Sequence, residues 1–133
     1  LRLGYMVASG DVVERTRRLQ PPWSVNGMAQ AAGLAALQDE GHLAKAREEV
    51  RRSKTYLMFE LEALGLTPLP SDANFVTVKV GDGSKVRTRL LAKGMAVRDC
   101  ASFGMPAYVR IAVRRESDCR RLIAALAQVV AGG

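Results

Sequence analysis

Apolar residues recur at helical spacing over one long stretch of the chain, between His42 and Gly65. One face of this stretch carries Leu43, Ala46, Val50, Leu57, Leu61 and Leu64, whereas lysine, arginine and glutamate fall largely on the other faces. Gly65 can end such a helix, because glycine readily adopts the left-handed conformation that follows a last helical turn. The pattern predicts a long amphipathic helix.

Two helices are predicted before it. The first covers residues 12–19, with a possible cap at Ser9 or Asp11, and stops at Pro21. The second covers residues 27–38, which are rich in alanine and leucine and contain little polarity. That composition favours a buried helix.

Two more helices are predicted in the second half of the chain. Ser84 can cap a short helix that stops at Gly94, and Ser117 can cap a final helix. The apolar face of the final helix would consist of Leu122, Ile123, Leu126, Val129 and Val130.

Strands are predicted at residues 75–80, 95–98 and 108–113. The first alternates in polarity, with Val76, Val78 and Val80 on one face, which is typical of a half-buried strand. The predicted architecture is therefore α+β, with helices packed on a sheet of about three strands.

Composition bounds the class of protein. The 133 residues suffice for a self-contained core, and the 48% hydrophobic and 25% charged fractions are ordinary for a folded globular domain. No apolar run approaches the roughly 18 residues of a membrane span, and no leader is visible, so we expect a cytoplasmic protein without a membrane partner. Cys100, Cys119 and His42 are too few ligands to predict a metal site.

The charge favours anionic partners. Twenty lysine and arginine residues against thirteen aspartate and glutamate residues give a formal net charge of +7. Aromatic residues make up 5% and do not interleave with the basic clusters as a base-stacking platform would require. We therefore expect no nucleic-acid partner.

Two arginines fall within predicted strands, Arg98 and Arg110, and Arg2 lies between Leu1 and Leu3 in an apolar opening run. A strand arginine must bind an anion or face water, so each is a candidate anion-binding residue or an exposed edge residue. Guanidinium groups bind carboxylate or phosphate bidentately, and two in one cleft would suit a doubly anionic substrate.

Four segments carry a family resemblance: residues 1–5 (LRLGY), residues 22–26 (PWSVN), the Asn74-Phe75 pair and residues 97–114. Over essentially all 133 residues the chain resembles the C-terminal part of fold-type I pyridoxal-phosphate enzymes, in the branch of histidinol-phosphate aminotransferases and threonine-phosphate decarboxylases. The opening without methionine leads us to expect a fragment of a longer protein.

The resemblance implies a domain division and site roles. Residues 1–24 would be a strip at the end of the large cofactor-binding domain with its linker, and residues 25–133 the small C-terminal α+β domain. Arg2 would bind the cofactor phosphate. Arg98 and Arg110 would bind anionic groups of the substrate.

Within the branch, residues 22–26 and 111–114 resemble the threonine-phosphate decarboxylases of cobalamin biosynthesis, because the aminotransferases tend to have glycine where Arg114 stands. We expect the substrate-clamping domain of such a decarboxylase. One alternative is the same domain of a histidinol-phosphate or related aminotransferase. The other is a non-catalytic basic module that binds anions.

The lysine that forms the Schiff base in this family precedes the motif that contains Arg2, so the resemblance places it upstream of this chain. We accordingly expect no catalytic residue here and no turnover by the chain alone. The parent protein would be the enzyme. It would carry pyridoxal phosphate, a large N-terminal domain and a small phosphorylated amino-acid or amine substrate, and would form a homodimer.

Overall fold

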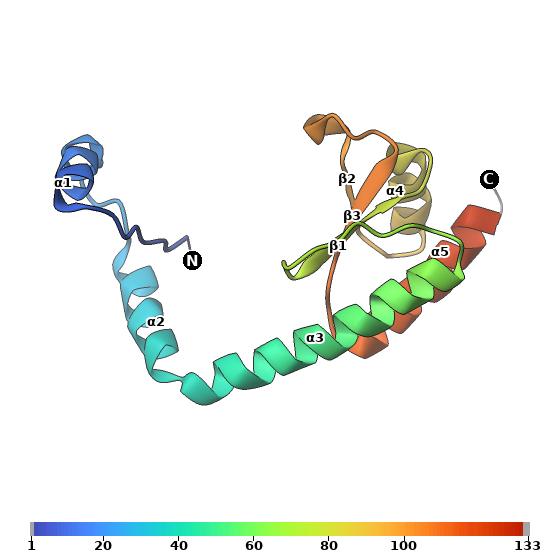
Figure 1. Cartoon of the computed structure of the whole chain (residues 1–133), viewed down its shortest axis with the longest axis horizontal. Helices are drawn as coiled ribbons and strands as arrows, with labels where there is room; N and C mark the ends of the chain where they lie inside the picture. The colour runs from blue at the N-terminus through green and yellow to red at the C-terminus, as the bar shows by residue number, and fades with distance from the viewer. Residues whose placement is uncertain (1, 132–133) are drawn as a thin grey trace. The chain divides into compact units, whose positions relative to one another are not determined.

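The computed structural model describes residues 2–131 and comprises two compact units, of which the first ends at Ala44 and the second begins at Lys45 (Figure 1). Helix α3 (Glu40–Ala63) runs through this boundary. It is the long amphipathic helix that the spacing predicts, and Gly65 follows it with a φ of 76°. The domain division after residue 24 stays a prediction.

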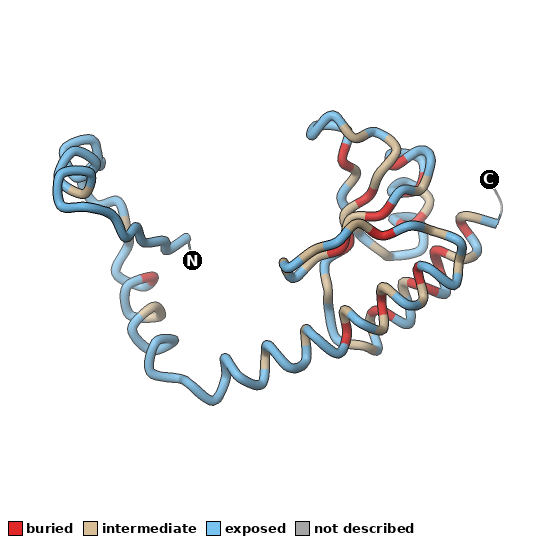
Figure 2. The backbone as a smooth tube through the Cα atoms, viewed as in Figure 1, coloured by how far each residue is buried: buried red, intermediate tan, exposed pale blue. Residues whose placement is uncertain are grey.

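The first unit contains α1 (Gly10–Leu19) and α2 (Gly27–Gln38). The side chain of Asn26 caps α2, accepting a hydrogen bond from the Ala29 N–H at 2.9 Å. The prediction that α2 is buried is wrong. Among residues 2–44 only Ala29 is buried, because few apolar side chains of its own unit cover the helix (Figure 2).

The second unit contains the sheet. Its strands are β1 (Phe75–Lys79), β2 (Arg98–Asp99) and β3 (Tyr108–Ala112), and within the described residues they form one antiparallel sheet in the order β1-β3-β2. Helix α4 (Gly83–Ala92) follows β1, the 3-10 helix η1 (Ala101–Phe103) joins β2 to β3, and α5 (Glu116–Ala131) ends the described chain. The predicted α+β architecture with a three-stranded sheet is confirmed.

The core lies on one face of this sheet. Strand alternation buries Val76 and Val78 of β1 and Val109 and Ile111 of β3. The helices contribute the remaining large buried side chains, chiefly Leu57 and Leu61 of α3, Leu90 of α4, and Ile123, Leu126 and Val129 of α5. The three α-helices of the unit therefore cover the same face, and within residues 45–131 no α-helix covers the opposite face.

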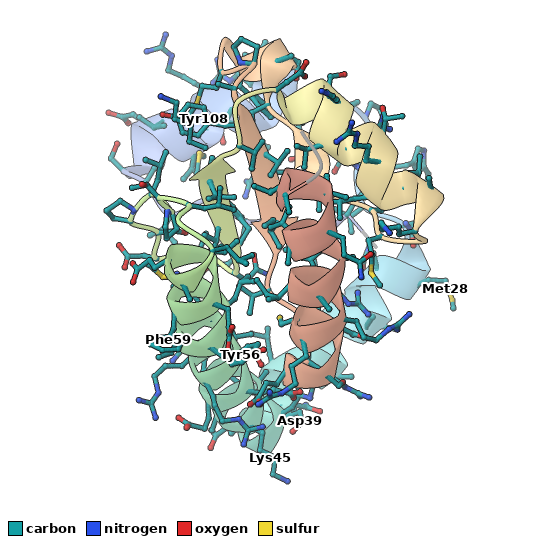
Figure 3. All side chains as sticks on the ribbon, turned by 90° about the vertical axis from the view of Figure 1, so that its right-hand side faces the viewer. Met28, Asp39, Lys45, Tyr56, Phe59 and Tyr108 are labelled. Atoms are coloured by element: carbon teal, nitrogen blue, oxygen red, sulfur yellow. The ribbon has the colours of Figure 1, made fainter. Side chains whose placement is uncertain are left out.

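Helices α3 and α5 lie side by side beneath the sheet (Figures 1 and 3). Tyr56 of α3 faces α5, where the guanidinium carbon of Arg120 lies 4.5 Å from the centroid of its ring. Burial, followed by the charge of Glu60, raises the pKa of the Tyr56 hydroxyl. Phe59 lies on the outer side of α3.

Several predicted boundaries differ in detail, and three of the differences concern the starts of α4 and α5 and the length of β2. Asp82 rather than Ser84 caps α4, accepting from the Lys85 N–H at 2.9 Å. Helix α5 begins at Glu116, so Ser117 lies inside it. Strand β2 is two residues long and begins at Arg98. Met95 still belongs to the turn at Gly94, because its N–H donates to the Leu90 carbonyl oxygen.

Candidate functional site

Arg98 and Arg110 lie on the open face of the sheet, on neighbouring strands. In the antiparallel register Arg98 is opposite Arg110, which is in turn opposite Thr77 of β1. Because Val109 and Ile111 point into the core, strand alternation sends Arg110 to the other face. The sequence predicted both residues as strand arginines, and the register brings them together.

The two arginines lack acidic partners. Within residues 2–131 neither forms an ion pair, and the adjacent Asp99 instead lies 3.8 Å from Nε of Arg87. Like charges directly opposite each other on neighbouring strands destabilise a sheet. A cross-strand pair of guanidinium groups without a carboxylate is therefore ready to bind an external anion.

Aromatic rings hold the two guanidinium groups instead. The guanidinium carbon of Arg110 lies 4.9 Å from the ring centroid of Phe75 and 5.8 Å from that of Phe103. The guanidinium carbon of Arg98 lies 5.6 Å from the centroid of the same Phe103 ring, and Nη2 of Arg98 donates to Oγ of Ser102 at 2.9 Å. Sequence reasoning missed Phe103, because it lies in a connection without hydrophobic periodicity.

A hollow opens beside the pair. Its lining includes Arg98, Arg110, Asn74 and Arg114, together with apolar atoms of Phe75 and Val113. Nε of Arg114 lies 3.3 Å from Oδ2 of Asp118, which is four residues further along the chain in α5. Two unneutralised guanidinium groups and a side-chain amide can bind a phosphate or carboxylate group through several charge-assisted hydrogen bonds.

Arg2 belongs to the first unit and lines a different hollow, with Leu3, Gly4, Ser24 and Asn26. Its side chain is exposed, and its backbone has a φ of 32°. The hydroxyl of Ser24 accepts a hydrogen bond from Nε2 of Gln20 at 2.6 Å and retains its own proton to donate. The cofactor role of Arg2 stays a prediction.

The described part of the chain offers neither a metal site nor a membrane-spanning helix. No group of three or more histidine, cysteine, aspartate or glutamate side chains there could hold a metal ion. Within residues 2–131, no helix combines the length and the apolar character needed to cross a membrane.

Comparison with known sequences gives a family match and close relatives. The family model described as aminotransferase class I and II matches residues 1–126. A histidinol-phosphate aminotransferase 1 from Nitrosococcus oceani is 42% identical over 98% of this chain and 35% of its own length. A histidinol-phosphate aminotransferase from Caldicellulosiruptor saccharolyticus is 40% identical over 98% of this chain and 37% of its own length. The chain thus spans about a third of the length of these relatives.

Solved structures share the fold. Histidinol-phosphate aminotransferase from Sinorhizobium meliloti, in complex with pyridoxal-5'-phosphate, matches 92% of this chain and 34% of its own with a TM-score of 0.81 at 24% identity. L-threonine-O-3-phosphate decarboxylase from Porphyromonas gingivalis matches 94% of this chain and 40% of its own with a TM-score of 0.78, also at 24% identity. At this identity the two structures establish the fold alone.

Proposed function

The chain belongs to the aminotransferase class I and II family, and from this premise we propose that it is the substrate-binding part of a pyridoxal-phosphate-dependent aminotransferase for a phosphorylated amine of the histidinol-phosphate type. The relatives at 40% and 42% identity are named histidinol-phosphate aminotransferases, whereas the decarboxylase resembles the chain in fold at 24% identity. We therefore favour the aminotransferase alternative, although residues 22–26 and 111–114 resemble those of threonine-phosphate decarboxylases.

The cross-strand arginine pair carries this proposal. Arg98 and Arg110 lie opposite each other, form no ion pair within residues 2–131 and line one hollow. A phosphate dianion matches two guanidinium forks better than it matches ammonium groups, because each fork donates two parallel hydrogen bonds. We assign both residues to the anionic groups of the substrates.

The cofactor site is proposed in part. When bound, pyridoxal phosphate withdraws electrons from the substrate Cα bond that breaks. Arg2 and the hydroxyl of Ser24, which line one hollow, suit a phosphate group because one brings charge and the other a free donor proton. We place the cofactor lysine and the groups around the ring outside this chain, so the chain alone does not turn over.

The role of the arginine pair is then to position the substrate. Anchoring its anionic group would fix which Cα substituent is oriented to leave when the cofactor is bound. Loss of the Cα proton leads to amino transfer, whereas loss of a carboxylate would give decarboxylation. Arg98 and Arg110 thereby bear on the reaction type as well as on affinity.

Assay of the whole protein with pyridoxal phosphate tests the proposal. With histidinol phosphate and 2-oxoglutarate we expect glutamate to form, and with O-phosphothreonine we expect no stoichiometric release of carbon dioxide. The isolated 133-residue chain serves as the control and should be inactive in both assays. Carbon dioxide from O-phosphothreonine without amino transfer would establish the decarboxylase instead, and inactivity of the whole protein in both assays would favour an anion-binding module.

A further inference from the structure

Phe103 contacts both members of the arginine pair. Its ring centroid lies 5.6 Å from the guanidinium carbon of Arg98 and 5.8 Å from that of Arg110. Phe75 is the other aromatic partner of Arg110, with its ring centroid 4.9 Å from the same guanidinium carbon. Rings and cations therefore alternate in one chain of contacts, from Phe75 to Arg110, Phe103 and Arg98.

The ring of Phe103 is presented by a hydrogen-bonded turn. The Gly104 N–H donates to the Ala101 carbonyl oxygen at 3.0 Å, and the Met105 N–H donates to the Cys100 carbonyl oxygen at 3.1 Å. Gly104 has a φ of 74°, the left-handed conformation that this pair of hydrogen bonds requires. Cys100 is buried, so the turn is anchored to the core at its base.

Packing does not account for this side chain. Phe103 is 57% exposed, and it lies outside the hydrophobic core cluster of the unit. An exposed phenylalanine gains little from burial, and the aromatic interactions that its ring makes within residues 2–131 are the contacts with the two cations. The face of an aromatic ring attracts guanidinium groups through its quadrupole.

An aromatic ring, unlike a carboxylate, leaves the charge and the N–H donors of a guanidinium group available to a ligand. An aspartate between Arg98 and Arg110 would neutralise them and compete with an incoming anion. A phenylalanine ring restricts their conformations without removing charge or occupying N–H donors. The two arginine side chains have then lost part of their conformational entropy already in the free protein, so that part is no longer a cost of anion binding.

We propose that Phe103 is the positioning residue of the arginine pair: its ring holds Arg98 and Arg110 in the arrangement that binds the anionic group of the substrate. The inference rests on the proposed function, because it assumes that the pair is the anion site. It assigns to Phe103 an action through the two guanidinium groups and no contact with the reacting atoms.

Titration of the full chain with inorganic phosphate tests this role. Phosphate binding is followed through the Nε–H signals of arginines labelled with nitrogen-15. Arg98→Lys and Arg110→Lys assign the two signals. Inorganic phosphate has no apolar surface that would gain from packing on the ring, so we attribute an effect of Phe103 to the arginines. We expect Phe103→Leu to weaken phosphate binding about three- to tenfold, as the loss of two cation–π contacts implies.

Rescue and a matched control separate positioning from a general effect. Phe103→Trp retains an aromatic face and should bind phosphate within about twofold of the unaltered chain. Phe59→Leu removes a comparably exposed ring, at 66%, from the outer side of α3 and should change nothing. If Phe103→Leu does not give the spectrum of a folded chain, Phe103→Met makes the same test.

The outcomes for the two claims are distinct. Normal phosphate affinity in Phe103→Leu, combined with weakened binding in both lysine variants, would overturn the positioning role and leave the arginine site intact. Normal affinity in Arg98→Lys and Arg110→Lys would overturn the arginine site and, with it, the basis of the proposed function. Weakened binding in Phe103→Leu with rescue by Phe103→Trp supports both claims.

Discussion

Gly83, the first residue of α4, lies against the backbone carbonyl oxygen of Tyr108 on β3. Its N–H donates to the Pro106 carbonyl oxygen at 2.9 Å, which docks the start of the helix on the segment leading into the strand. The same segment follows the turn that carries Phe103. The contact therefore connects α4 to the segment between the Phe103 turn and β3.

Gly83→Ala should destabilise the protein. A Cβ there would meet the Tyr108 carbonyl oxygen and lie 3.0 Å from the Pro106 carbonyl oxygen, and neither backbone atom can move as a side chain can. We expect a loss of about 1–3 kcal/mol in the free energy of unfolding, measured by urea denaturation. Gly27→Ala, at the open first position of α2, is the control, and an equal effect of the two changes would refute the close contact.

Two adjacent leucines of α4 test the position of the core. Leu90 is fully buried, whereas Leu91 is 51% exposed. Leu90→Ala should reduce the free energy of unfolding by about 2–5 kcal/mol, because it leaves a cavity. Leu91→Ala should cost less than about 1 kcal/mol. Similar losses for both variants in urea denaturation would show that α4 does not pack as described.

Alkaline pH should destabilise the second unit through Cys119. Burial raises the pKa of this thiol above 9.0, and Sγ donates to the Arg114 carbonyl oxygen at 3.5 Å. The folded state thus keeps a proton that the unfolded state releases, so this contribution to stability is present below 9.0 and is lost as the pH rises through the folded pKa.

The free energy of unfolding measured between pH 8 and pH 10 checks this expectation. It should fall over that range, and the fall should be smaller in Cys119→Val, which has no titrating thiol. Tyr56, whose pKa is raised above 10.0, contributes only at higher pH. Identical pH profiles for the two proteins would exclude Cys119 as the cause.

Arg2→Gln should weaken cofactor binding by the whole protein. Removing a guanidinium group from a phosphate site costs charge-assisted hydrogen bonds, which corresponds to a loss of about tenfold or more. Titration with pyridoxal phosphate, followed by cofactor absorbance, measures this directly. Arg15→Gln, an exposed arginine of α1, is the control, and unchanged affinity in Arg2→Gln would place the phosphate elsewhere.

Periodicity predicted the elements that bury a regular face. Strands β1 and β3 and the second half of helix α3 follow the expected spacing, because their apolar residues meet one core. Leu43, near the start of the helix, is 53% exposed although the spacing places it on the apolar face. The same reasoning failed for α2, whose alanine-rich sequence resembles that of a buried helix although only Ala29 is buried. The composition of a helix shows how apolar the helix is. Whether the helix is buried depends on the other surfaces of its own unit.

The candidate site was predictable only in part. Chemistry singled out Arg98 and Arg110, since a guanidinium group in a strand requires an anion or water. The register that sets them opposite each other depends on non-local strand pairing, which no local pattern encodes. Phe103 lies in a turn fixed by Gly104 and Cys100, and nothing in its sequence neighbourhood indicates that its ring reaches two cations.

The most direct test of the central claim is the steady-state kinetics of the whole protein carrying Arg98→Lys or Arg110→Lys. Lysine retains the charge and loses the bidentate fork, so we predict that KM for histidinol phosphate rises about tenfold or more in each variant. Arg51→Lys, an exposed residue whose Nη2 lies 2.8 Å from Glu48, is the matched control and should leave KM unchanged. Unchanged KM in both site variants would contradict the account.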